Sequence, residues 1–76
     1  MRMEVRLHGG LERYTGNATL VVLDVAPGAT LLALQDQLGI PRGDVGLFVV
    51  DGELRQEADV PDADTQVDLY PLFGGG

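Results

Sequence analysis

The sequence predicts an α+β roll in which one mixed sheet of four to five strands wraps around one main helix. Residues 1–7 alternate between apolar and polar side chains, which is typical of a half-buried strand. Leu31, Leu34 and Leu38 form one apolar stripe at helical spacing. The chain has 76 residues, enough for one domain, and its expected elements follow the order strand, strand, helix, strand, short strand, strand.

The N-terminal part is predicted to form an antiparallel hairpin with a long connection. Met1, Met3, Val5 and Leu7 share one face of the first strand. A histidine and two glycines then interrupt the pattern, and the residues that follow have the spacing of a short helical turn. Residues 19–25 are rich in β-branched side chains and are expected to form the second strand.

The helix has start and stop signals at both ends. Thr30 is a suitable N-cap, Gly39 is placed to follow the last turn, and Pro41 prevents continuation. These signals predict a helix of about nine residues. We expect its stripe to be buried against Met3, Val5, Leu7, Val67 and Leu69.

Three more strands are expected, at residues 45–50, 53–55 and 66–70. Asp51 and Gly52 predict a tight turn between the first two of these strands, since both tolerate positive φ. Residues 56–65 are mostly polar and are interpreted as a loop, and Pro71 ends regular pairing. The right-handed crossover rule places the strand that follows the helix beside and parallel to an earlier one.

The formal net charge is −7, and all five basic residues are arginines. Such a surface repels phosphate backbones and anionic lipids, so neither nucleic acid nor a membrane is an expected partner. A protein partner with a basic docking face is one interpretation of the acidity, and solubility alone is another. The start of the chain has no apolar signal segment and no apolar run approaches the roughly 20 residues of a membrane span, so we expect a cytoplasmic protein.

No conventional catalytic or metal site is predicted. The chain contains neither Cys nor Ser, which excludes disulfides, thiolate metal sites and the two commonest nucleophiles. His8 has no partner nearby in the sequence, and Asp59, Asp62 and Asp64 lack the spacing of a calcium loop. We therefore expect a structural or solvated histidine and a solvated acidic loop.

The C-terminal end is the expected functional part. We interpret residues 1–71 as the folded domain and residues 72–76 as a flexible tail that ends in Gly74, Gly75 and Gly76. Glycine allows a backbone to thread a narrow channel without side-chain clashes, and an extended tail reaches roughly 20 Å. A frayed terminus or a cloning scar is the alternative. Leu72 and Phe73, together with Phe48 or its strand neighbours, are expected to form an apolar docking surface rimmed by acidic groups.

The predicted fold and the glycine end together resemble the MoaD/ThiS family of ubiquitin-like β-grasp sulfur carriers, over the whole chain. Residues 67–76 (VDLYPLFGGG) are similar to the last strand, proline-marked exit and diglycine of that family. Residues 11–16 are similar to its first long connection, which favours the MoaD branch over the ThiS branch, and residues 50–52 to its turn after the third strand. The third glycine and a longer acidic loop depart from the pattern.

The resemblance implies a carrier without a catalytic site or a permanently bound cofactor. It also implies that an adenylating enzyme related to those that activate ubiquitin uses ATP to join the Gly76 carboxylate to AMP, and that a sulfur donor then converts this adenylate to a thiocarboxylate. The resemblance to the MoaD branch implies that the large catalytic subunit of molybdopterin synthase then receives the sulfur. Three alternatives remain: a carrier for thiamine or another sulfur metabolite, a protein modifier conjugated through Gly76, and an interaction module whose tail is inert.

Overall fold

The computed structural model describes residues 1–72. Within this range the chain forms five strands, one α-helix and one short 3₁₀ helix, in the order predicted from the sequence. The strands are β1 (Arg2–Leu7), β2 (Leu20–Asp24), β3 (Val45–Val50), β4 (Glu53–Arg55) and β5 (Gln66–Pro71), and the helices are η1 (Leu11–Thr15) and α1 (Leu31–Gln37).

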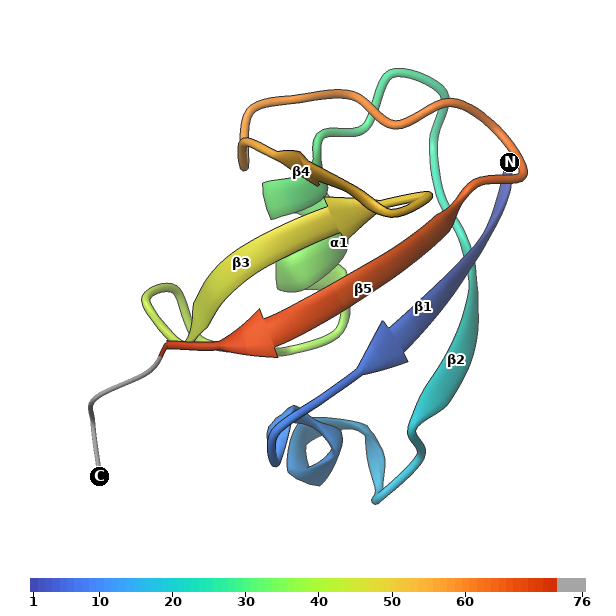
Figure 1. Ribbon diagram of the computed structural model, residues 1–76. Helices are drawn as coiled ribbons and strands as arrows, with labels where there is room; N and C mark the ends of the chain where they lie inside the picture. The colour runs from blue at the N-terminus through green and yellow to red at the C-terminus, as the bar shows by residue number, and fades with distance from the viewer. Residues whose placement is uncertain (73–76) are drawn as a thin grey trace.

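All five strands belong to one mixed sheet in the order β2-β1-β5-β3-β4 (Figure 1). β1 pairs with β2 antiparallel and with β5 parallel. The prediction that the strand after the helix lies beside and parallel to an earlier strand is wrong, because β5 occupies the position next to β1, and β3 lies on the far side of β5 and runs antiparallel to it. As a result β5, which leads to the C-terminus, is the central strand of the sheet.

The helix α1 packs on one face of this sheet, as the leucine stripe predicts (Figure 1). The buried cluster combines helix and sheet residues from both halves of the chain, including Leu31, Leu34, Leu38, Met3, Val5, Leu7, Val67 and Leu69. In β1 the odd-numbered side chains are buried and the even-numbered ones exposed, so the predicted facing of this strand is confirmed. Burial of this single cluster holds the sheet and the helix together.

The predicted helix boundaries are confirmed to within two residues. The Thr30 hydroxyl accepts a hydrogen bond from the Ala33 N–H at 3.1 Å. At the other end Gly39 has φ +76°, and the N–H groups of Gly39 and Ile40 donate to Asp36 and Gln35 at 3.0 and 3.2 Å. This pair of bonds is a Schellman motif, which ends the helix after seven residues rather than about nine.

The turn between β3 and β4 is also as predicted. Asp51 and Gly52 both have positive φ, 48° and 83°, which is the backbone of a type I′ turn. The Asp51 carboxylate accepts a hydrogen bond from the Gln66 N–H at 2.8 Å, and the Asp51 N–H donates to the Gln66 carbonyl at 2.9 Å. The turn is thereby attached to the start of β5.

Candidate functional site

The candidate site is the end of β5, where the central strand passes into the C-terminal segment (Figure 1). Pro71 is the last residue of the strand and pairs with Val45 of β3. The Leu72 N–H donates to the Asp44 carbonyl at 3.2 Å, and the Leu72 side chain is 65% exposed. The other predicted tail residues lie outside the described residues: Phe73, Gly74, Gly75 and Gly76.

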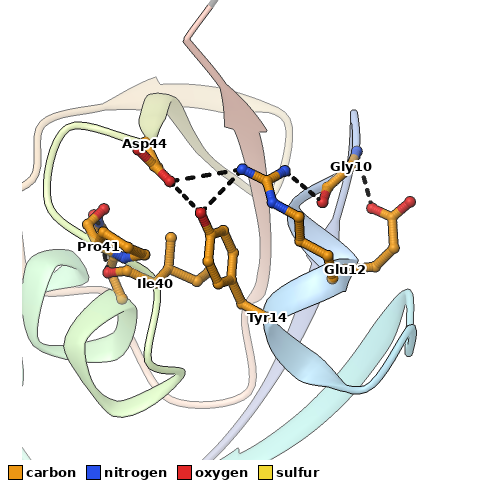
Figure 2. Close-up of polar contacts among 8 residues, drawn as sticks. Gly10, Glu12, Tyr14, Ile40, Pro41 and Asp44 are labelled. Atoms are coloured by element: carbon orange, nitrogen blue, oxygen red, sulfur yellow. Dashed lines mark hydrogen bonds and ion pairs between the residues drawn. The ribbon is translucent and has the colours of Figure 1, made fainter.

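Asp44, which accepts the Leu72 N–H, is itself held by side chains of η1 (Figure 2). The Tyr14 hydroxyl donates to the Asp44 carboxylate, and the Arg13 guanidinium lies 3.7 Å from the same carboxylate oxygen. Arg13 also donates to the Tyr14 hydroxyl oxygen at 3.0 Å and to the Gly10 carbonyl at 2.9 Å. The connection after β1 and the turn before β3 are therefore joined beside the end of β5.

The turn that carries Asp44 is fixed from the helix side as well (Figure 2). Gln35 is 2% exposed, and its side-chain amide donates to the carbonyls of Pro41 at 2.9 Å and Ile40 at 3.4 Å. Ile40 is buried in the core. A buried amide needs such partners, because an unpaired polar group in the core costs free energy. The position of Asp44 thus depends on both η1 and α1.

The predicted docking surface requires a correction at Phe48. This side chain is 7% exposed and belongs to the core, because it points to the same face of the sheet as α1. Its neighbour Leu47 points to the opposite face and is 37% exposed, and Leu54 of β4 is 66% exposed. Val49 and Leu54 are cross-strand partners. We call the exposed residues Leu47, Leu54 and Leu72 the outer apolar surface.

His8, expected to be structural or solvated, has two partners on this outer face. Its Nε2 lies 2.8 Å from the Asp68 carboxylate, and its ring stacks on Tyr70 with centroids 4.4 Å apart and planes 7° from parallel. Both partners lie in β5, about 60 residues further along the chain. The arrangement fastens the end of β1 to β5, which favours a structural role.

The remaining charged groups are mostly at the surface. Arg42 donates to the Asp36 carboxylate at 2.8 Å, and this hydrogen bond holds the pKa of Asp36 below its usual value. Among residues 1–72 no three His, Asp or Glu side chains come together in a way that would hold a metal ion. No helix in the same range has the length and hydrophobicity to cross a membrane.

Comparison with known proteins finds similarity in structure rather than in sequence. No protein-family model matches the chain, and a search of curated proteins finds no match. Small archaeal modifier protein 1 (SAMP1) of Haloferax volcanii superimposes with a TM-score of 0.76 at 22% identity, over 100% of both chains.

Two further solved structures carry the name molybdopterin converting factor. A Pyrococcus furiosus protein described as its subunit 1 gives a TM-score of 0.76 at 14% identity, covering 93% of this chain and 97% of its own. A chain from the complex of subunits 1 and 2 of Helicobacter pylori gives 0.64 at 21% identity, over 100% of both chains. The predicted fold is therefore confirmed: the chain has the MoaD/ThiS-like, ubiquitin-like β-grasp fold.

Proposed function

We propose that this protein is a sulfur carrier of the MoaD/ThiS type, which acts through Gly76 as its terminal residue. The supporting observation is that the central strand of a ubiquitin-like fold leads directly into Leu72, Phe73 and three glycines. The similar solved structures are named as a modifier protein and as molybdopterin converting factor subunits, all small chains. This chain contributes the group to be modified, and its partners contribute the catalysis.

The proposed chemistry has two steps. In the first, a Gly76 carboxylate oxygen attacks the α-phosphorus of ATP in the partner enzyme, which forms an acyl-adenylate and releases pyrophosphate. In the second, a sulfur nucleophile such as hydrosulfide attacks the acyl carbon and displaces AMP, which leaves a thiocarboxylate. Gly74 and Gly75 would allow the backbone to enter the active site without side-chain clashes.

Two partners follow from this chemistry. The first is the adenylating enzyme, which needs access to the tail and docks on the outer apolar surface together with Phe73. The second is the enzyme that takes the sulfur. The H. pylori structure is described as a complex of subunits 1 and 2 of molybdopterin-converting factor, which supports the large subunit of molybdopterin synthase as that acceptor. Thiamine or another sulfur metabolite is the alternative destination.

A second candidate function is protein modification. The full-length match to a protein named as a small archaeal modifier favours it. Both functions share the acyl-adenylate, but in the second the acceptor is a lysine amine of another protein and the product is an isopeptide bond. The chain itself has no Lys, so it cannot form lysine-linked chains of itself.

Intact mass spectrometry distinguishes these functions. A chain ending at Gly76 is incubated with a matched adenylating enzyme, ATP and a sulfide source, and conversion of the carboxylate to a thiocarboxylate adds about 16 Da. A chain extended by one residue should stay unmodified, because it moves the carboxylate by roughly 3.5 Å, and ~1 Å already costs about a hundredfold in rate. Gly75→Val should stay unmodified too, although it still binds the enzyme.

The outcomes separate the candidates. Linkage of Gly76 to lysines of other proteins, without the thiocarboxylate, would favour the modifier. If neither product forms with any adenylating enzyme that binds the chain, both functions are excluded and an interaction module with an inert tail remains.

A further inference from the structure

Gly46 lies where the backbones of β3 and β5 come very close together. It is the extra residue of a β-bulge, which interrupts the β3–β5 register between Val45 and Leu47. A Cβ atom added at Gly46 would lie 2.9 Å from both Leu72 Cα and the Pro71 carbonyl oxygen. These are backbone atoms, so no side-chain rotation can relieve the clash.

Gly9, which follows β1, approaches Pro71 from the other side of β5. A Cβ atom at Gly9 would lie 2.6 Å from Pro71 Cδ and closer still to Cγ, so it would overlap the proline ring. The turn that carries Gly9 is attached to β5, because the His8 N–H donates to the Leu69 carbonyl at 3.0 Å. Pro71 therefore lies between Gly9 and Gly46, which we call the glycine pair, and Leu72 lies against Gly46.

Gly46 has no conformational reason to be glycine. Five other glycines have positive φ and open space where a Cβ would be, so their turns explain them: Gly16, Gly28, Gly39, Gly43 and Gly52. Gly46 has no such φ, and a glycine inside a strand costs stability. Close approach to Leu72 is the feature that only glycine permits at this position.

We propose that Gly9 and Gly46 are positioning residues for the activation of Gly76. They let the Pro71–Leu72 segment lie against the rest of the domain, where Asp44 binds the Leu72 N–H and is itself held by Tyr14. This fixes the point from which the chain continues toward the terminal carboxylate. The inference rests on the proposed function, because it assigns the glycine pair to the delivery of that carboxylate.

The first test is Gly46→Ala, compared with Gly43→Ala. Gly43 is three residues before Gly46 and has φ +94° with open space, so its substitution adds backbone strain near the site without touching Leu72. With a matched adenylating enzyme, ATP-dependent pyrophosphate exchange gives kcat at saturating carrier, and calorimetry gives the dissociation constant. We expect Gly46→Ala to lower kcat about 10- to 100-fold, since displacements near 1 Å have effects of that order.

Separate measurements of kcat and of the dissociation constant distinguish a positioning role from a merely structural role. For Gly46→Ala we expect a dissociation constant within about threefold of the wild-type value, because the substitution displaces Leu72 alone among the three residues of the outer apolar surface and leaves the side chains of Leu47 and Leu54 in place. For Gly43→Ala we expect wild-type kcat. A wild-type kcat for folded Gly46→Ala, or a loss confined to binding, overturns the proposal.

The second test is a double-mutant cycle, which keeps the proposal falsifiable if Gly46→Ala does not fold. Gly9 has φ +63°, so Gly9→Ala adds backbone strain in both backgrounds. It should lower kcat clearly more with Pro71 present than beside Pro71→Ala, because the smaller side chain lacks the Cγ and Cδ atoms that clash. Gly46→Ala meets backbone atoms and should gain nothing from Pro71→Ala. Equal effects of Gly9→Ala in both backgrounds overturn the role of Gly9.

Adenylation of the wild-type chain distinguishes failure of this inference from failure of the proposed function. If the wild-type chain is never adenylated, the proposed function fails, and the positioning role fails with it. If the wild-type chain is adenylated and the glycine-pair variants react equally fast, the function stands and the inference alone is overturned.

Discussion

At the scale of single residues, some positions act through neighbours in the sequence, and others act through residues far along the chain. Thr30, Gly39 and the Asp51–Gly52 turn act through neighbours at most a few residues away, so composition and spacing identify them. Gly46 is different, because its requirement comes from Leu72, and nothing near Gly46 in the sequence indicates it. The same bulge alters the register of β3, where a shift of one residue decides which side chain faces outward.

Leu54 and Leu20 provide a residue-scale test of the outer apolar surface. Leu54 lies on β4, the edge strand next to β3, and Leu20 lies on β2 at the opposite edge of the sheet. We expect Leu54→Asp to weaken binding of the adenylating enzyme at least about tenfold, since a charge in an apolar contact must be desolvated. Leu20→Asp, the same change at another exposed leucine, should bind normally.

Isothermal calorimetry of both variants, with thermal unfolding as a control for the fold, measures the difference. Phe73→Asp should behave like Leu54→Asp if Phe73 contributes to the same surface. Equal affinities for Leu54→Asp and wild type would show that the partner docks elsewhere.

At the scale of elements, all six predicted strands and helices are present, whereas their arrangement in space depends on pairing between distant strands. Periodicity two in β1 and the leucine stripe in α1 identify their own inner faces. Strand order depends on long-range pairing, and the sequence pattern alone does not place β5 between β1 and β3. Because that placement makes the tail continue from the centre of the sheet, the main feature of the site had to come from the structure.

Leu34 and Leu32 test the contribution of α1. Leu34 is 1% exposed in the core, whereas Leu32 is only partly buried on the same helix. We expect Leu34→Ala to lower the free energy of unfolding by about 2–5 kcal/mol and Leu32→Ala by clearly less, because the first leaves a cavity in the core. Urea unfolding followed by circular dichroism gives both values, and equal costs would contradict the assignment of the core face.

At the scale of the whole molecule, the excess of negative charge affects stability and association more than any single ion pair does. Twelve acidic residues stand against five arginines, and exposed pairs such as Arg42–Asp36 and Arg13–Asp44 contribute little individually. The domain measures 35 × 24 × 20 Å. At 0.01 M salt the screening length is about 30 Å, so most of these charges repel one another across the domain, whereas at 0.1 M it is about 10 Å.

We therefore expect sodium chloride to stabilise this domain and to slow its association with a basic partner. Raising the salt from about 0.01 to 0.1 M should raise Tm by several degrees, since about 1 kcal/mol corresponds to roughly 4–8 °C in a domain of this size. Scanning calorimetry measures this shift. The double variant Asp62→Asn, Asp64→Asn, in the exposed loop before β5, should show a smaller shift because it removes two of the repelling charges.

Stopped-flow association with the adenylating enzyme should slow over the same range, since screening weakens the attraction between opposite charges. A Tm that falls with salt would mean that local ion pairs outweigh the overall repulsion. An association rate independent of salt would mean that the acidity keeps the protein soluble without guiding it to its partner.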